Sequence, residues 1–552
     1  SSDLDEGVIE GTFYHSGSIF LGAEKYINDK HSLSFAAMIA PTERASQAAA
    51  TEETYWLANS HYYNSNWGYQ AGKKRNARVT KTLEPTGVLT WDVKFNDKTK
   101  LTTTAVFKYS RYGTTALNWG SNAADPRPDY YKNLPSNAYN VWDLVPEDWQ
   151  LNTWQNLYDF WKADKANRQI NWDKLYLLNQ NDIDADGLKR AHYVQQERRT
   201  DQRDFNLAGS LRYKLSSLLT LRGGASARIN NTEYYNIVAD MLGGDYFVNI
   251  DNFADRDFAS DPAKVQNDLD YYNAHGEAQK VKVGDKYGHD YFAKVRTFQA
   301  WGSGELAAGN FSANLAARIG YDTFWRDGVW KKGLFPDDSQ GESEHQKFFT
   351  YGAKAGVNYV IGGTQRVYAN VGYYADAPKF NQAFLSPRTR NTVADNLTTV
   401  KTFSSDVNWQ YSGGGYNFRV TGYYTTINDQ TDLMSFYDDL QNAFTNFSMT
   451  GINERHMGVE LGFKAPLPFD ALAVQGALSL GEFVYTSNPY MTQTVDNSAT
   501  VVIDNQLVPY WMSNPVYRRD ADGNYTDEIE RTALTESYRR SRAGSCFRSL
   551  WM

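Results

Sequence analysis

Paired segments with alternating apolar and polar side chains constrain the fold of this sequence most. In one of them, residues 311–322, the apolar series Phe311, Ala313, Leu315, Ala317, Ile319 and Tyr321 alternates with mainly polar or small residues. Successive side chains of a β-strand point to opposite faces, so a period of two predicts strands with one apolar face. Short polar turns that tolerate positive φ join the segments into hairpins. We place these turns at 28–30, 96–98, 215–217, 307–310, 362–365, 412–415 and 466–468, which predicts about fourteen strands.

The connections at the other end of these hairpins are long. They cover approximately 41–85, 112–200, 230–290, 325–346, 377–400, 429–452 and the chain from 487 onward. Short turns at one end and long loops at the other are typical of an antiparallel up-and-down transmembrane β-barrel. The sequence therefore predicts an all-β fold of this class. We expect loops 112–200 and 230–290 to be extracellular, and the turns at Asn96, Gly362 and Gly413 to be periplasmic.

The two faces of each strand must differ if the wall is embedded in a membrane. A closed barrel pairs every backbone polar group in hydrocarbon, but its outward side chains must be apolar. We therefore predict that Leu315, Val371, Val420 and Leu461 face lipid. The residues predicted to face the lumen are Arg318, Asn370, Arg419 and Glu460. Tyr, Phe and Trp make up 15% of the chain, and many of them cluster at the loop ends of strands, where aromatic rings meet lipid headgroups.

Several functional classes are disfavoured by the composition. The net charge of −8 argues against a nucleic-acid partner. The single cysteine, Cys546, rules out a disulfide framework and a Cys-based zinc site within this sequence. The eight histidines are scattered, and neither HExxH nor Gly-x-Ser-x-Gly occurs. We predict that the chain is not an enzyme and carries no cofactor, catalytic residue or metal ligand.

One segment needs weighing against that prediction. Residues 182–187, with the sequence DIDADG, match the opening of a calcium loop, which needs oxygen ligands at its first, third and fifth positions. The twelfth position is Tyr193 instead of the bidentate Glu. We therefore favour a solvated acidic turn before a helix-like run, Leu188–Arg199, while calcium binding at Asp182–Asp186 stays open.

The loop 112–200 is rich in tryptophan and provides the candidate substrate-binding residues. These are Trp119, Trp142, Trp149, Trp154 and Trp161, and Trp172 lies in the same loop. Such rings can stack on a sugar, peptide or chelate, or they can build a small core within the loop. For a single Trp we favour the core, whereas for the set we expect some ligand contact. A short helix is predicted from Pro146 to about Ala166, because Pro-Glu-Asp suits a helix N-terminus.

A family resemblance adds to this interpretation. The segments NWGYQ (66–70), DPRPDYY (125–131), SPRTRN (386–391), GIN (451–453) and GVELGF (458–463) resemble TonB-dependent outer-membrane receptors. In particular, the chain resembles large receptors with a carboxypeptidase-regulatory-like domain before the plug. The resemblance implies a 22-stranded barrel, an N-terminal plug that contacts a TonB-type energy-coupling protein, and import of a bulky nutrient such as a metal chelate, glycan or peptide. It also implies contact with outer-membrane lipid and leaves room for a surface lipoprotein partner. The alternative is a passive binding or adhesion barrel in the same membrane.

The chain departs from the family pattern in its extent. The plug and TonB box are not found in these residues, and about fourteen strands are fewer than 22. We therefore expect residues 1–530 to form a partial receptor barrel, an open curved sheet with two unpaired edges. Residues 531–552 form an atypical basic tail, because arginines interrupt any apolar period-two face. We interpret this tail as a shortened loop or a frame-shifted end.

Overall fold

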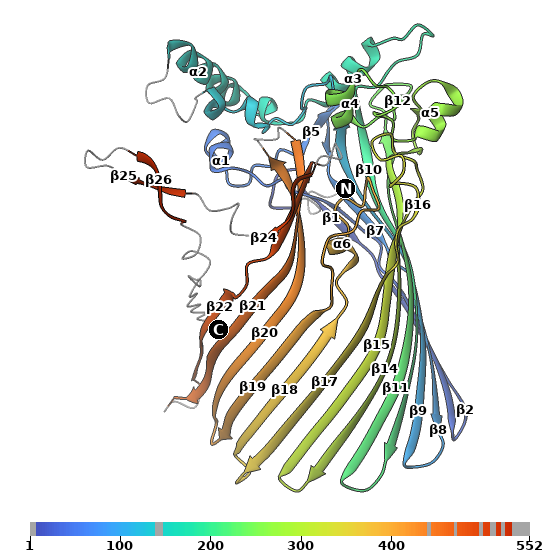
Figure 1. Ribbon diagram of the computed structural model, residues 1–552, viewed down its shortest axis with the longest axis vertical. Helices are drawn as coiled ribbons and strands as arrows, with labels where there is room; N and C mark the ends of the chain where they lie inside the picture. Colours follow the sequence, from blue (N-terminus) through green and yellow to red (C-terminus); the bar gives the residue numbers. More distant parts are fainter. Residues whose placement is uncertain are drawn as a thin grey trace.

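The computed structural model describes residues 7–138, 147–438, 443–467, 472–495, 501–507, 515–519 and 525–532. Trp142, Cys546 and the tail from residue 533 lie outside these ranges. One large antiparallel sheet forms a curved wall, with tight turns at one end and helices at the other (Figure 1). The fold class predicted from the sequence, an antiparallel up-and-down β-barrel wall, is therefore confirmed, whereas the strand count stays a prediction.

The wall is built from consecutive strands, each paired with the next along the chain. In order these are β2 (Ile19–Asn28), β3 (His31–Ile39), β8 (Thr86–Lys94), β9 (Thr99–Trp119), β10 (Tyr193–Lys214), β11 (Leu219–Asp240), β14 (Lys286–Ala308), β15 (Phe311–Gly328), β17 (Gln346–Ile361), β18 (Gln365–Asp376), β19 (Val400–Gly413), β20 (Tyr416–Asp438), β21 (Ala443–Pro466) and β22 (Ala473–Tyr485). All seven hairpin turns predicted from the sequence fall between strands that pair with each other. Local turn chemistry therefore located the hairpins at the turn end of the wall.

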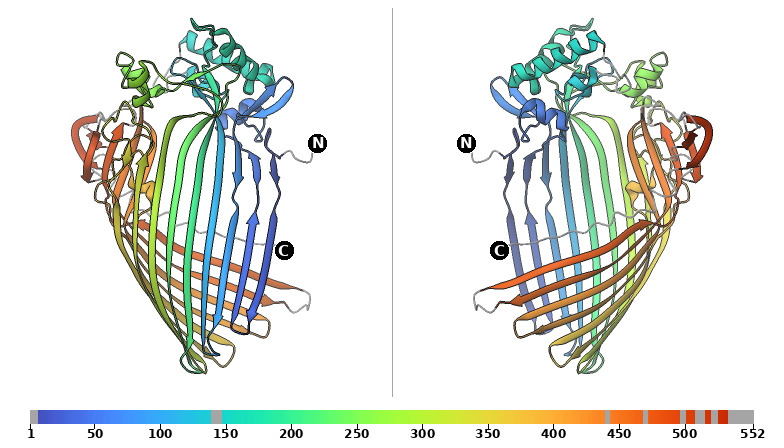
Figure 2. Two further views of the ribbon diagram at one scale, coloured as in Figure 1. Left: turned by 90° about the vertical axis from the view of Figure 1, so that its right-hand side faces the viewer. Right: turned by 90° about the vertical axis from the view of Figure 1, so that its left-hand side faces the viewer.

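Shorter strands extend the wall toward the loops. They are β1 (Tyr14–Ser16), β4 (Thr42–Ala45), β7 (Val79–Leu83), β16 (Gly341–Glu342), β23 (Tyr490–Val495) and β24 (Val501–Leu507). Three further pairs stand apart from the large sheet: β5 (Trp67–Gln70) with β6 (Lys73–Asn76), β12 (Phe247–Val248) with β13 (Lys280–Val281), and β25 (Pro515–Arg519) with β26 (Tyr525–Thr532). The curvature of the wall places β2 and β22 along its two margins (Figure 2). Within the described chain, β2 pairs with β3 and β22 pairs with β21.

The helices gather at the loop end of the wall. They are α1 (Glu52–Ala58), α2 (Asp148–Ala163), α3 (Trp172–Asn181), α4 (Asn252–Phe258), α5 (Leu269–His275) and the single turn α6 (Phe380–Ala383). Short 3-10 turns cover Tyr131–Asn133, Pro135–Ala138 and Lys165–Arg168. No helix in the described ranges is long and apolar enough to cross a membrane. The helix predicted from Pro146 to about Ala166 is confirmed as α2.

Two sequence expectations about this end of the molecule are wrong. The helix-like run Leu188–Arg199 is mostly extended, because β10 begins at Tyr193 and pairs with β9 from there. The connection 429–452 is largely a hairpin, since β20 runs to Asp438 and β21 begins at Ala443. In both places the hydrogen-bonded ladder continues beyond the segment with alternating hydrophobicity.

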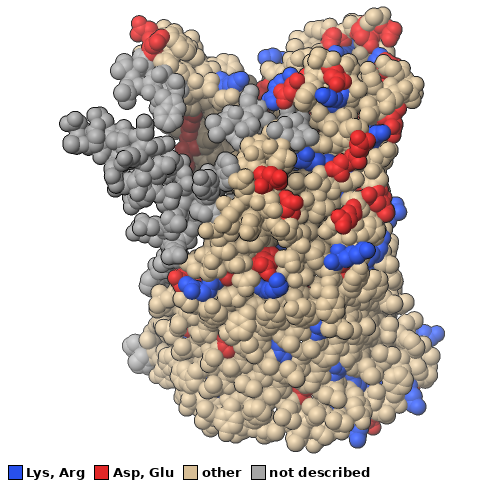
Figure 3. Space-filling model, in the orientation of Figure 1, with Lys and Arg blue, Asp and Glu red and all other residues tan. Residues whose placement is uncertain are grey.

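The register confirms that the residues predicted to face lipid share one face of the wall. Leu315 pairs with Ala355, and Ala355 pairs with Val371, so Leu315 and Val371 share a face. Val371 pairs with Ser405 of β19, and Ser405 pairs with Tyr424 of β20. Tyr424 shares its face of β20 with Val420, which pairs with Leu461 of β21. The residues predicted to face the lumen, Arg318, Asn370, Arg419 and Glu460, each lie an odd number of positions away and take the opposite face. The lower part of the surface in Figure 3 carries few charged residues, as a lipid-facing belt requires.

Candidate ligand site at the loop end of the wall

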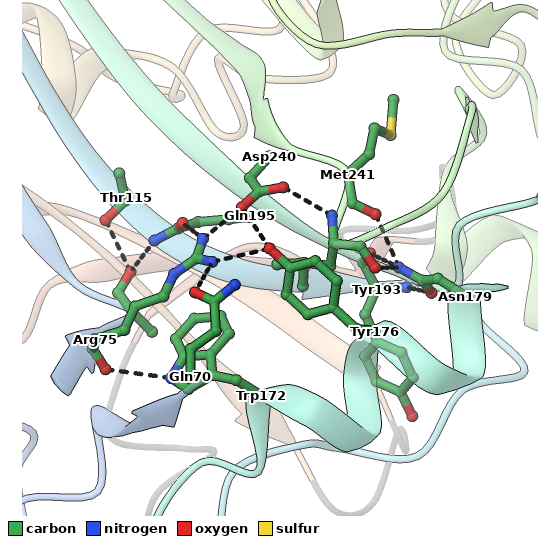
Figure 4. Close-up of polar contacts among 12 residues, drawn as sticks. Gln70, Arg75, Thr115, Trp172, Tyr176, Asn179, Tyr193, Gln195, Asp240 and Met241 are labelled. Atoms are coloured by element: carbon green, nitrogen blue, oxygen red, sulfur yellow. Dashed lines mark hydrogen bonds and ion pairs between the residues drawn. The ribbon is translucent and has the colours of Figure 1, made fainter. Parts of the chain in front are cut away.

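A buried polar network ties the loops at this end to the wall, and Arg75 is its centre (Figure 4). Arg75 lies on β6 and donates to Gln70 (2.7 Å) and to the carboxylate of Asp240 (2.8 Å), and it also donates to Gln195. Its guanidinium lies 4.2 Å from the ring centroid of Trp172. Because Gln195 and Asp240 belong to β10 and β11, this one cation joins the β5–β6 hairpin and helix α3 to the wall.

Asn179 is the second residue that connects the loops to the wall by hydrogen bonds. It is fully buried and donates through Nδ2 to the carbonyl oxygens of Tyr193 (2.7 Å) and Met241 (2.9 Å). Its Oδ1 accepts from the backbone N–H groups of His192 (2.8 Å) and Tyr193 (3.1 Å). A buried amide that satisfies both ends on the backbone of other segments fixes the geometry of those segments. Helix α3 is therefore held against the upper ends of β10 and β11.

The candidate tryptophans fall into different environments. Trp161 is 1% exposed and packs with Leu57, Tyr63 and Leu134, and Trp172 is fully buried in a second cluster. Trp119 packs against that second cluster and lies 5.7 Å below the guanidinium of Arg127. These three rings therefore fit the alternative in which the tryptophans build a small core within the loop.

Trp149 and Trp154 remain accessible on α2. Trp149 is 60% exposed and donates through Nε1 to Glu147 (2.7 Å). Trp154 stacks on Tyr158 with centroids 5.1 Å apart and planes 8° apart, and Trp56 of α1 lies 5.3 Å from Tyr158. Trp56, Trp154 and Tyr158 form what we call the aromatic platform. A half-exposed set of rings at the loop end can stack on a planar or ring-shaped ligand.

Three arginines from separate segments form a second feature, which the sequence analysis missed. Arg78, Arg198 and Arg388 are all exposed, and the positive charges of Arg78 and Arg388 both act on Arg198. Arg198 lies on the inner face of β10, where it pairs with Thr114 of β9. Within the described residues, no carboxylate forms an ion pair with any of these three arginines. We call them the arginine cluster.

Neighbouring side chains orient the arginine cluster. When the amide oxygen of Gln196 faces Arg198, it accepts from Nε (3.1 Å) and Nη2 (3.2 Å), while the amide nitrogen donates to Tyr287 Oη (2.7 Å). His289 is partly buried, and its electrostatic neighbours include Arg198 and Arg388. Tyr234 and Tyr291 stack nearby with centroids 5.1 Å apart, and the charge of Arg388 acts on Tyr291.

The loop that carries Arg388 is anchored by a buried cation. Arg326 of β15 is 1% exposed and donates to the carbonyl oxygens of Pro387 (2.6 Å) and Ser339 (2.7 Å). The turn closes on itself where the N–H of Arg390 donates to Ser386 O (3.0 Å). Arg388 is therefore held in place by charge-assisted bonds to its own backbone neighbourhood. Guanidinium groups can bind carboxylate, catecholate or phosphate oxygens.

The acidic segment 182–187 shows a self-contained turn. Asp184 accepts from the N–H groups of Asp186 (3.0 Å) and Leu188 (2.9 Å) and from Tyr246 Oη (2.9 Å). These bonds, with the Leu188 N–H contributing most, hold the pKa of Asp184 below its usual value. Burial is the main reason that the pKa of Tyr246 rises to about 12, and the bond to Asp184 adds to it. The arrangement favours the acidic-turn interpretation, and no described group of three acidic, His or Cys side chains is placed to hold a metal.

Comparison with known proteins supports the fold. No protein-family model and no curated protein matches the chain. Among solved structures it is similar to the copper transporter OprC, with a TM-score of 0.51 and 11% identity over 88% of this chain and 56% of that one. The ferric citrate transporter FecA matches with a TM-score of 0.47 and 8% identity, covering 94% and 61% of the two chains. FpvA of P. aeruginosa, bound to a pyoverdine–iron complex, matches with a TM-score of 0.47 and 10% identity, covering 88% of this chain and 52% of that one. The chain thus spans between half and two thirds of the length of these proteins, and the likeness concerns the fold.

Proposed function

We propose that this chain forms the wall of an outer-membrane receptor that imports a bulky, negatively charged nutrient by TonB-dependent, energy-coupled transport. The arginine cluster is the observation that carries this proposal. Three accessible guanidinium groups, one of them on the inner face of β10, have no carboxylate partner among the described residues, and they repel one another unless an anion joins them. The fold shared with the copper transporter OprC supports a transport role over an enzymatic one.

The cluster also narrows the classes of nutrient that the sequence left open. A metal chelate with carboxylate or catecholate groups fits best, because arginine binds planar oxyanions in a bidentate manner. An acidic peptide or acidic glycan satisfies the same chemistry, whereas a neutral glycan does not. In this proposal the aromatic platform, with Trp149 beside it, makes the first contact with the ligand, and the arginine cluster holds it below.

The binding experiment compares Arg198→Gln with Arg212→Gln. Both arginines are exposed on the same face of β10, but Arg212 lies near the turn end, about 46 Å along the strand from Arg198. The probe is ferric citrate, and cobalamin serves as a comparison without the same negative charge. Loss of a charge-assisted bond of about 1.5–3 kcal/mol should weaken ferric citrate binding about 10- to 100-fold in Arg198→Gln. Equal affinities for the two variants, measured by quenching of tryptophan fluorescence, would contradict the role of the cluster.

A transport experiment separates the importer from the passive barrel. The receptor is produced in the outer membrane of cells, and accumulation of radioactive iron from ferric citrate is followed with and without a proton uncoupler. An energy-coupled importer loses accumulation with the uncoupler but keeps surface binding. A passive barrel keeps both, and in planar bilayers it conducts ions like a porin.

A further inference from the structure

A break in the ladder between β11 and β14 changes the direction of His289. The pairing skips two residues of β14, Gly288 and His289, between the partners of Tyr235 and Asn236. Gly288 has a φ of 76°, which glycine adopts without the steric cost of a Cβ. A bulge of this kind re-aims a side chain out of the regular alternation of a strand. His289 is therefore free of the in-and-out pattern of β14.

Contacts on two sides place His289 beside the arginine cluster. Its Nδ1 lies 3.3 Å from Nδ2 of Asn236, and Asn236 pairs directly with Arg198 across β11 and β10. On the other side the ring of His289 lies 6.0 Å from that of Tyr291. The guanidinium of Arg326, which anchors the turn that carries Arg388, lies 5.1 Å from the centroid of Tyr291.

The charges that act on His289 come from cations on four segments. Lys332 donates to the carbonyl oxygen of Gly288, the residue before His289. Burial of the ring, followed by the charges of four cations, holds the pKa of His289 well below its ordinary value. These cations are Arg388, Lys332, Arg198 and Arg326. The imidazole is therefore neutral at pH 7 when the site is empty.

The nearest carboxyl group along the chain belongs to the other face of the wall. Asp290 pairs with Tyr235, one residue from the Asn236 that contacts His289, and so takes the opposite face. Lys286 donates to Asp290 (2.8 Å) and also to Glu233. Burial nevertheless raises the pKa of Asp290 to about 6. An experiment on His289 therefore needs a control for Asp290.

Asn236 can hold the imidazole in either protonation state. In the neutral ring, Nδ1 can accept from Nδ2 of Asn236, whereas a protonated ring must donate from Nδ1. Oδ1 of Asn236 is buried and has no hydrogen-bond partner among the described residues. A half-turn of the Asn236 amide brings this oxygen to Nδ1. An acceptor for the protonated ring is thus already beside it.

We propose that His289 is a further residue of the anion site and takes up a proton as the anion binds, so that the site holds its ligand more tightly at acidic pH. The ligand is the anion of the proposed function, on which this inference rests. An anion among these cations cancels the repulsion that opposes a charge on the ring, and by linkage the added proton strengthens anion binding.

The sign of the pH dependence follows from the two states of the site. Above the pKa of His289 in the occupied site, the ring is neutral with and without the anion, and the affinity does not change with pH. Below that pKa the affinity rises as pH falls, by at most tenfold per pH unit for one proton. The rise ends where the ring is protonated in the empty site as well.

The first test is isothermal titration calorimetry of the full chain in detergent. The probe is tris(oxalato)chromate(III), an inert carboxylate chelate whose negative charge does not change between pH 5.5 and 7.5. Its Kd should be about tenfold smaller at pH 5.5 than at pH 7.5. Titrations at pH 6 in two buffers with different ionisation enthalpies count the protons taken up on binding. Binding without proton uptake by the unaltered chain would overturn the inference without the need for a variant.

The second test assigns the proton to one side chain. His289→Gln should bring the ratio of the two Kd values close to one and abolish proton uptake, whereas Asp290→Asn should keep both. Heat-modifiable gel mobility checks that each variant is folded. A ratio that survives in His289→Gln, or that disappears in Asp290→Asn, would overturn the inference. If Arg198→Gln still weakens binding at both pH values, that result leaves the import proposal standing. Absence of binding by the unaltered chain at both pH values would refute the proposed function, and the role of His289 with it.

Discussion

Placing a charge on each face of one strand tests the membrane orientation of the whole wall. Val371 is 44% exposed on the apolar outer face of β18, and its neighbour Asn370 points inward and donates to Asp406 (3.0 Å). We compare Val371→Arg with Asn370→Arg, which carry the same new charge one residue apart. Only the face distinguishes the two variants.

The magnitude follows from the depth of the site. Val371 lies eight residues beyond Gly363 in the turn, and a strand tilted by about 40° rises about 20 Å over that length. An apolar belt of about 25 Å then places Val371 inside hydrocarbon but beyond its middle. An Arg costs about 2–4 kcal/mol at the midplane and less toward the interface, so we expect about 2 kcal/mol for Val371→Arg. In Asn370→Arg the guanidinium can pair with Asp406, and we expect a change below about 1 kcal/mol.

The assay is urea unfolding of the chain inserted in phosphatidylcholine vesicles, followed by tryptophan fluorescence and by gel mobility with and without heating. A difference of about 2 kcal/mol corresponds to about a 30-fold change in the unfolding equilibrium. Equal destabilisation of the two variants, or a larger effect of Asn370→Arg, would refute the assignment of the faces.

Three further predictions concern the loops. Asn179→Ala should make the loop that contains α3 sensitive to protease and lower its local stability by about 2–4 kcal/mol, because the change leaves several buried backbone groups unpaired. Backbone hydrogen exchange of this loop at the rate of the unaltered chain would contradict the prediction. Burial raises the pKa of Asp129 and outweighs the hydrogen bond from Ser65, so the loop is more stable at acidic pH and loses that stability as pH rises through the raised pKa. Asp129→Asn should therefore protect the loop from protease at pH 7 and flatten the pH dependence of its cleavage. Trp161→Ala should destabilise the α1–α2 region by about 3–5 kcal/mol, whereas Trp149→Ala should leave the thermal unfolding of that region unchanged and weaken ligand binding. The reverse pattern would show that Trp149 is the packing residue and Trp161 the ligand contact.

The hairpins and faces of the wall could be predicted from the sequence because both are set locally. A turn such as Gly362–Gln365 needs residues that accept positive φ, and Gly362 and Gly363 have φ of 59° and 77°. A lipid-facing strand must alternate strictly, so Leu315 and Val371 show their faces in the sequence itself. Above the belt this requirement disappears, although the ladder of hydrogen bonds continues. For that reason the hairpin at 429–452 and the start of β10 at Tyr193 left no period in the sequence.

The candidate site likewise has features that the sequence determines and features that only the tertiary structure determines. The sequence by itself determined where aromatic residues concentrate, but the packing of α1, α2 and α3 decided that Trp161 is buried and that Trp154 remains partly exposed. Arg78, Arg198 and Arg388 lie in three separate segments, and only the register of β10 and the anchoring of the 386–391 turn by Arg326 bring them together. Electrostatic clusters of this kind depend on distances across the fold. Local patterning therefore specified a membrane wall, and the tertiary structure alone decided which of its charges act on one another.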